Sequence, residues 1–433
     1  MKRVYLVSLG CPKNLVDAEV MLGLLGTGGY KPTHQPREAD LILINTCAFI
    51  QEATRESIET ILALAQEKEK GQLLVVAGCL PQRYGGEIRE ILPEVDLWVD
   101  LHSLEKLPDI LLGKGASPSP LPFLPHHSLP RHPLTPPSWA YLKIAEGCDN
   151  RCHYCTIPSI RGPLRSRPVE DLVAEAKKLA RRGAVELNLI AQDTTRYGED
   201  LGYSQGLFRL LDALEEIPGI RWIRLMYAHP AGITRALATR LGRGKVLPYL
   251  EMPIQHVNEA VLSSMGRRGG RRAVMEAMEA LTRGREIFLR TTVMVGYPTE
   301  GEREFQELMD FLREAPLFRL AAFAYSHEEG TPAATLPQVP EKERQKRLNQ
   351  VLAFQEELHY ARNLELVGRE FPVLLEEPGW GRFPGQAPEI DGKVKVQAEV
   401  EVEVEVEEKD IIELVITDAD GVDLYGRPGM TKG

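Results

Sequence analysis

Cysteine is scarce in this sequence, with six residues among 433. Their wide spacing excludes the dense disulfide framework of a small secreted domain, so we expect reduced thiols that can serve as metal ligands. Long apolar runs are also lacking. The N-terminal apolar stretch is too short for a signal peptide, and no later stretch approaches the roughly 20 residues of a membrane-spanning helix. The sequence therefore predicts a cytoplasmic protein without membrane attachment.

Charge is distributed unevenly along the chain. The net charge is −10, and residues 366–433 account for −9 of it, with 16 acidic and 7 basic side chains. The preceding residues nearly balance, with 46 acidic and 45 basic side chains. Almost all of the excess negative charge therefore lies in the C-terminal region.

The length of the chain is sufficient for about three domains. In residues 1–114, apolar runs alternate with helical patterns, which predicts an α/β domain with an open parallel sheet. The expected strands are residues 4–9, 41–45, 73–77 and 97–99. Cys11, Cys47 and Cys79 each follow the end of such a strand, where open sheets bind their ligands. Taken alone, these thiols are either buried filler or ligands that meet at one edge of the sheet.

Residues 115–138 contain eight prolines and no periodic pattern, which predicts an extended linker. Residues 139–366 then show six strand–helix units, which predict a partial (β/α)6 barrel with a long exit helix at 341–366. The expected strands are residues 141–145, 186–191, 222–226, 249–252, 288–295 and 320–324. The residues that follow these strands, where barrels hold their chemistry, include Gln192, Asp193, His229, Gln255, His256 and Gly296.

Residues 367–433 predict a small acidic β-barrel, with strands at 371–375, 392–396 and 411–417. Between them, residues 398–407 alternate apolar residues with glutamate, which is typical of a half-buried strand. A slip of two residues would keep every side chain on its face, so the flanking turns must set the register.

The most specific motif lies at residues 147–155, where Cys148, Cys152 and Cys155 follow the spacing CxxxCxxC. Three thiolates on a four-iron cubane leave one iron open to another molecule. A structural zinc ion is normally closed by four ligands, and no fourth cysteine lies nearby in the sequence. His153 is placed awkwardly for that role within so short a loop. The motif therefore favours an iron–sulfur cluster over zinc.

This loop resembles the signature of the radical S-adenosylmethionine superfamily, whose fold is also a partial barrel. The resemblance implies that the open iron binds S-adenosylmethionine and that reductive cleavage yields a radical that abstracts hydrogen. It also places the backbone of Tyr154 near the adenine, although core packing explains this side chain equally well. Two pairs at strand ends, Gln192 with Asp193 and Gln255 with His256, are expected to contact the cofactor or the substrate, with Gln192 and His256 as the cofactor contacts; the alternative is that these residues cap loops.

The N-terminal cysteines gain a role from a second resemblance. Three motifs resemble those of the methylthiotransferases, a radical S-adenosylmethionine family that ends in a β-barrel called TRAM: residues 8–19, 45–47 and 77–79. The family implies that Cys11, Cys47 and Cys79 hold a second 4Fe-4S cluster, which carries the sulfur. Ala18 departs from the family, in which serine is common, but alanine fits the same helix.

Members of this family modify either an adenosine in the tRNA anticodon loop or an aspartate of ribosomal protein S12. An acidic C-terminal barrel would repel RNA and attract a basic ribosomal protein, unless its glutamates only keep an exposed strand soluble. Residues 11–17 and 157–167 also agree with the protein-modifying branch. We therefore predict methylthiolation of the aspartate β-carbon in S12, without direct RNA binding by the acidic tail. The further partners expected are an electron donor such as flavodoxin or ferredoxin, and a sulfur source.

Three arginines follow the cluster loop, namely Arg161, Arg165 and Arg167. They either grip an acidic group of the substrate or form surface ion pairs. Two other functions remain as alternatives for the whole chain: methylthiolation of tRNA, and a non-catalytic metal-binding scaffold.

Anaerobic reconstitution with iron and sulfide distinguishes the enzyme from the scaffold. Two cubane clusters would give about eight irons per chain, and reduction should then cleave S-adenosylmethionine. Bound zinc without cleavage of the cofactor would instead identify the scaffold.

Overall fold

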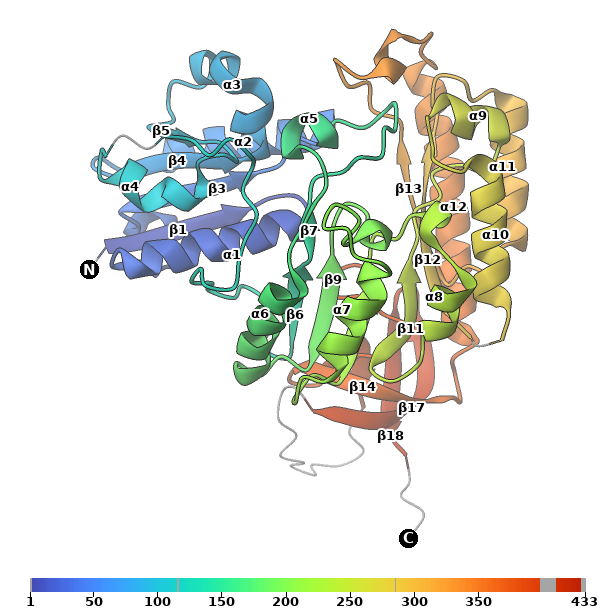
Figure 1. Ribbon diagram of the computed structural model, residues 1–433. Coiled ribbons are helices and arrows are strands. Elements are labelled where there is room, and N and C mark those ends of the chain that lie inside the picture. Colours follow the sequence, from blue (N-terminus) through green and yellow to red (C-terminus); the bar gives the residue numbers. More distant parts are fainter. Residues whose placement is uncertain (1, 115–116, 285, 398–409, 430–433) are drawn as a thin grey trace.

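The computed structural model describes residues 2–114, 117–284, 286–397 and 410–429. The N-terminal unit, in blue, lies beside a central barrel, and the red C-terminal strands lie at one end of that barrel (Figure 1). The acidic strand expected at residues 398–407 lies outside the described residues. Among the described helices, none is both long and apolar enough to cross a membrane.

The N-terminal unit is an open sheet of parallel strands in the order β2-β1-β3-β4-β5. Its strands are β1 (Lys2–Ser8), β2 (Tyr30–Pro32), β3 (Leu41–Thr46), β4 (Leu73–Gly78) and β5 (Leu97–Val99). Its helices are α1 (Pro12–Thr27), α2 (Gln51–Glu67), α3 (Cys79–Ile91) and α4 (Leu107–Leu111). β3 is buried along its whole length, so it reads as a continuous apolar run. The sequence does not predict β2, because this short strand is mostly exposed and has no apolar run.

The proline-rich segment contains no helix or strand in its described part, residues 117–138. It is nevertheless packed against both neighbouring units. Arg131 is buried, its Nε donates to Glu19 of α1 at 2.7 Å, and its Nη1 donates to Glu175 at 2.6 Å. This segment therefore contributes to docking as well as to chain connection.

The central unit is a partial barrel of parallel strands in the order β13-β12-β11-β10-β9-β6, which confirms the (β/α)6 prediction. Its strands are β6 (Trp139–Lys143), β9 (Glu186–Ile190), β10 (Trp222–Leu225), β11 (Val246–Glu251), β12 (Phe288–Val295) and β13 (Arg319–Ala324). Its longer helices are α6 (Val169–Arg181), α7 (Gly206–Glu215), α8 (Arg235–Arg240), α10 (Gly270–Thr282) and α11 (Glu302–Glu314). The expected exit helix is α12 (Glu341–Leu364).

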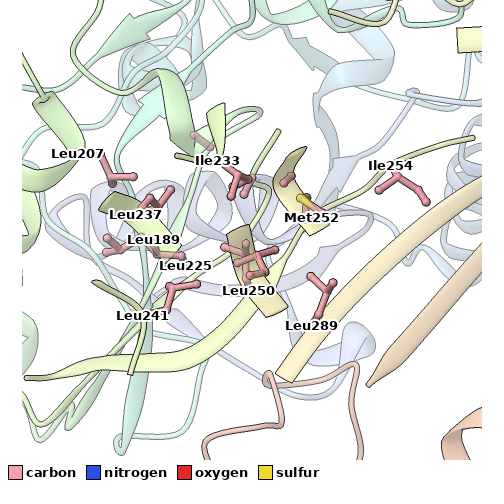
Figure 2. Close-up of a cluster of buried hydrophobic side chains, with 14 of the residues drawn as sticks. Leu189, Leu207, Leu225, Ile233, Leu237, Leu241, Leu250, Met252, Ile254 and Leu289 are labelled. Atoms are coloured by element: carbon pink, nitrogen blue, oxygen red, sulfur yellow. The ribbon is translucent and has the colours of Figure 1, made fainter. Parts of the chain in front are cut away.

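An apolar layer lies between the barrel strands and the outer helices (Figure 2). Leu189, Leu225 and Leu250 extend from three neighbouring strands and belong to the same buried cluster as Leu207 of α7 and Leu237 of α8. Because side chains alternate along a strand, the residues next to these leucines face the barrel interior. The interior is therefore free to carry charged side chains.

The C-terminal unit is a closed barrel of strands in the order β14-β15-β16-β18-β17. Its strands are β14 (Glu370–Glu377), β15 (Trp380–Arg382), β16 (Val394–Val396), β17 (Ile411–Asp420) and β18 (Asp423–Pro428). The predicted strands correspond to β14, β16 and β17. The sequence does not predict β15 or β18, because glycine and charged residues interrupt both of them.

Buried polar contacts join the C-terminal barrel to the central one. Glu186 of β9 pairs with Arg224 of β10 at 2.7 Å and with Arg382 of β15, and all three side chains are fully buried. Burial opposes ionisation of this carboxyl, but Arg382 and Arg224 together hold the pKa of Glu186 below its usual value. Tyr249 adds a second link, since its hydroxyl donates to Asp391 at 2.8 Å.

Replacing Arg382 by methionine would leave Glu186 and Glu376 buried with too few cations. Loss of one partner of a buried pair costs about 3–5 kcal/mol, so we expect a loss of that size in urea unfolding followed by circular dichroism. The control is Lys393→Met, which breaks the exposed pair with Glu377 and should cost at most about 1 kcal/mol. Equal losses in the two variants would contradict the role of the buried pairs.

Candidate active site

Three cysteines gather at one edge of the N-terminal sheet. Cys11, Cys47 and Cys79 follow the carboxyl ends of β1, β3 and β4, which are adjacent strands. Gly10 adopts φ +89°, and a Cβ atom there would lie 2.6 Å from the Cβ of Cys47 and 2.9 Å from its Sγ. Gly78 adopts φ +99°, and its added Cβ would lie 2.8 Å from the last carbonyl oxygen of β3. Only glycine therefore permits the close approach of these loops.

The protein surroundings of these three cysteines disfavour the deprotonated thiolate form when no metal is bound. Burial, assisted by Cys11 and Cys79, raises the pKa of Cys47 to about 12. Burial also raises the pKa of Cys79, although Arg161 Nη2 donates a hydrogen bond to its Sγ at 3.2 Å. Thiolates in such a site need a metal centre whose positive charge offsets their burial. Three free thiols at one sheet edge fit the ligand set of an iron–sulfur cluster.

The second triad lies in the loop after β7 (Ala145–Glu146), near the carboxyl end of β6. Gly147 begins this loop at φ +78°, and a Cβ atom there would lie 2.0 Å from the carbonyl oxygen of Pro163. Burial raises the pKa of Cys148 to about 11 and that of Cys155 to about 12, and Cys152 contributes to both shifts. The protein surroundings of this loop therefore also disfavour thiolates without a metal centre.

Polar side chains from other parts of the barrel hold this loop. Asn150 Nδ2 donates to Asp193 Oδ2 at 2.7 Å, and both residues are buried. Arg267 Nη1 lies 3.7 Å from Cys152 Sγ. The side chain of Tyr154 packs against the barrel core, and contact of its backbone with adenine stays a prediction.

Within the described residues, no three His, Cys, Asp or Glu side chains surround a single point as one metal ion requires. The ligands of a cubane bind different irons and need not converge in that way. Closed zinc sites also take a fourth protein ligand, which neither triad of cysteines provides by itself. Both triads therefore suit clusters that keep one iron open.

A buried charge network extends from the N-terminal triad to Glu146, which lies just before the barrel loop. Asp17 of α1 pairs with Lys143 of β6 at 2.7 Å and with Arg161 at 2.7 Å. Glu146 of β7 pairs with the same two cations, at 2.8 Å from Arg161. Burial opposes ionisation of Glu146, but Arg161 and Lys143 bring its pKa to about 2, so it stays charged. Two anions and two cations thus balance at the junction of the N-terminal unit and the barrel.

The expectation of surface ion pairs for the arginines after the cluster loop is wrong for Arg161 and Arg167. Both are buried, because buried or half-buried carboxylates compensate their charges, and for Arg161 one of these is Asp17 of the distant α1. Arg167 pairs with Asp171 and Glu175 of α6. Arg165 is partly buried and donates to a carbonyl of the proline-rich segment.

Asp17, Lys143 and Glu146 also belong to the site, although the sequence motifs do not indicate them. A lysine within the otherwise apolar strand at 139–143 is the available signal, since a buried ammonium needs an acidic partner. The sequence does not show which acidic residue that is.

Gln192 and His256, the predicted cofactor contacts, follow the carboxyl ends of β9 and β11. Gln192 Nε2 donates to Glu146 Oε1 at 2.5 Å, and its own Oε1 is buried without a hydrogen-bond partner in the described chain. His256 is buried, its Nδ1 accepts from Asn258 N at 2.9 Å, and its Nε2 lies 3.3 Å from Glu300. Gln192 therefore joins the buried charge network, whereas the His256 side chain contacts Asn258 and Glu300 of the barrel.

Asp193 caps a turn, in agreement with the alternative interpretation, and His229 does the same. Asp193 Oδ1 accepts from Thr195 N at 3.1 Å, and His229 Nδ1 accepts from Ala231 N at 3.1 Å. Burial, followed by nearby arginines, lowers the pKa of His229 to about 2, so its ring is neutral. Gln255 adopts a left-handed φ of +67° and forms a bridge to β12.

Comparison with known proteins agrees with the three units. Residues 3–100 match an uncharacterized protein family, UPF0004, residues 142–312 match the Radical SAM superfamily, and residues 367–428 match the TRAM domain. A solved radical S-adenosylmethionine methyltransferase, TsrM from Kitasatospora setae with cobalamin and a 4Fe-4S cluster bound, has a TM-score of 0.56 at 13% identity. The match covers 77% of this chain and 74% of that chain, and it supports the fold alone.

The chain is therefore a radical S-adenosylmethionine enzyme, a class that implies S-adenosylmethionine and a 4Fe-4S cluster. Proteins named ribosomal protein uS12 methylthiotransferase RimO are 45% identical in Pelobacter propionicus and 44% identical in Geobacter sulfurreducens. Each match covers 98% of this chain, and 97% and 98% of those relatives. The relative from Moorella thermoacetica is 46% identical over 92% of this chain and 93% of its own length. The chain belongs to this RimO family of methylthiotransferases.

Alanine at position 147 tests the barrel loop. It needs a left-handed backbone and collides with Pro163, so Cys148 must move. We expect Gly147→Ala to lower the iron content after anaerobic reconstitution from about eight to about four per chain. The matched control is Gly202→Ala, which has φ +68° but no atom within 4 Å of the added Cβ. Iron loss in both variants, or in neither, would contradict the role of this loop.

Proposed function

We propose that this chain transfers a methylthio group to the β-carbon of an aspartate in ribosomal protein S12. The observation that carries the proposal is a second cysteine triad, held against the barrel by one buried charge network that contacts Cys79. Hydrogen abstraction requires only the barrel triad. Insertion of sulfur also requires a site that carries the sulfur, and the second triad would provide it. The uS12 methylthiotransferase name of the full-length relatives supports the same substrate.

Two 4Fe-4S clusters and S-adenosylmethionine belong to this proposal. Cys148, Cys152 and Cys155 would hold one cluster, with Tyr154, Gln192 and His256 as cofactor contacts. Cys11, Cys47 and Cys79 would hold the other. When bound, these groups supply a radical that removes hydrogen from the substrate carbon and the sulfur that replaces it. The protein's own contribution is to orient the loops and to exclude water around the thiols.

Lys13 supports an acceptor that carries a carboxylate. Its Nζ lies 3.2 Å from the centroid of the Tyr227 ring, which follows β10 at the carboxyl end of the barrel. Burial lowers the pKa of Lys13, while the neighbouring Cys11 and Glu251 favour its charged form. A lysine amine beside the N-terminal triad supplies hydrogen-bond donors for a carboxylate. Aspartate therefore fits this position better than adenosine does.

Charge supports a basic protein as the partner, because residues 366–433 carry −9. The proposal also includes a one-electron donor such as flavodoxin or ferredoxin, a separate sulfur source and a cytoplasmic location. We propose that the chain divides into an N-terminal domain at 1–114, a linker at 115–138, the barrel with its exit helix at 139–366, and the acidic β-barrel at 367–433.

Mass spectrometry of ribosomal protein S12 from a deletion strain tests the proposal. We expect the aspartate modification to disappear, to return with the wild-type gene, and to stay absent with Cys79→Ala. Gly202→Ala serves as the control and should restore it. An aspartate modification that persists in the deletion strain would rule out S12 as the substrate. Loss of a methylthio-adenosine from digested tRNA would instead identify tRNA.

A further inference from the structure

Arg161 contacts the N-terminal cysteine site and follows the barrel loop closely in the sequence. It ends α5 (Ile157–Arg161), the short helix just after Cys155. Its Nη2 donates to Cys79 Sγ at 3.2 Å and to Asn14 Oδ1 at 2.9 Å. The side chain is only 3% exposed, so neighbouring protein groups fix its position.

Asn14 aligns the guanidinium with the N-terminal triad. Its Nδ2 donates to the carbonyl oxygen of Leu9 at 2.7 Å and to that of Thr46 at 3.2 Å. These two carbonyls lie just before Cys11 and Cys47 in the chain. The Asn14 Oδ1 is thereby directed to Arg161, which in turn contacts the third thiol. One amide and one guanidinium thus connect all three ligand loops.

Such a contact has a defined effect on an iron–sulfur cluster. The reduction potential depends on the charge around the cluster and on hydrogen bonds to its sulfurs. Reduction adds one electron, and a cation at a ligand sulfur stabilises the additional negative charge. The effect is largest in a buried site, where water and salt screen the charge least.

We propose that Arg161 is a positioning residue that raises the reduction potential of the N-terminal cluster, and that Asp17 limits this rise. The inference rests on the proposed function, because it requires a cluster on the N-terminal triad. Arg161 and Lys143 balance Asp17 and Glu146. Loss of the Arg161 charge therefore leaves this group of four side chains net negative, whereas loss of the Asp17 charge leaves it net positive.

The test uses the full-length chain with Cys148, Cys152 and Cys155 replaced by alanine, so that only the N-terminal cluster forms. After reconstitution with about four irons, the protein is titrated with dithionite and followed by electron paramagnetic resonance. We expect Arg161→Gln to lower the potential and Asp17→Asn to raise it. The double variant should return towards the starting value, and Arg161→Lys should lower the potential less than Arg161→Gln.

The matched control is Arg167→Gln, which removes another buried arginine but one that pairs with Asp171 and Glu175. It should leave the potential unchanged. A merely structural role for Arg161 would reduce iron content without shifts of opposite sign. Shifts of one sign, or no shift at full iron content, would overturn the inference.

The remaining outcomes are also decisive. If Arg161→Gln does not retain iron, a raised potential in Asp17→Asn supports the inference, and an unchanged potential overturns it. If the starting protein with three alanines binds no iron, the second cluster of the proposed function is absent. That result would overturn both proposals. Iron binding without any shift in reduction potential would overturn only the inference about Arg161 and Asp17.

Discussion

Two carboxylates and two cations lie buried where the N-terminal sheet meets the barrel. Removal of such charges from water costs several kcal/mol per ion, and only close partners in good geometry offset that cost. Asp17 comes from the N-terminal unit, whereas Lys143, Glu146 and Arg161 come from the barrel. The charges therefore balance only when the two units are docked. The same contacts fix the separation of the cysteine triads.

Further contacts across this junction also hold the N-terminal unit against the barrel. Arg83 of α3 pairs with Glu328 at 2.7 Å, and Glu328 also accepts from the backbone of Gln51 at 2.8 Å. Thr156, directly after the cluster loop, donates to the carbonyl oxygen of Phe49 at 3.0 Å. The proposed transfer of a methylthio group depends on this rigidity, because small errors in position greatly reduce the rate.

Local patterns explain what the sequence could predict. The barrel strands and the two cysteine triads follow from apolar runs, motif spacing and resemblance, whereas the short strands β2, β15 and β18 have too little pattern. The charge network could not be predicted from local patterns, since Lys143 and Asp17 are 126 residues apart and no local motif indicates that they pair. The burial of Arg161 could not be predicted for the same reason. Its partners become neighbours only in the folded chain.

Diffraction from anaerobically grown crystals, measured across the iron absorption edge, is the most direct test of two clusters on one rigid frame. We predict two compact iron sites, one at Cys11, Cys47 and Cys79 with Arg161 beside it, and one at the barrel loop. A single iron site, or zinc at either triad, would contradict this arrangement.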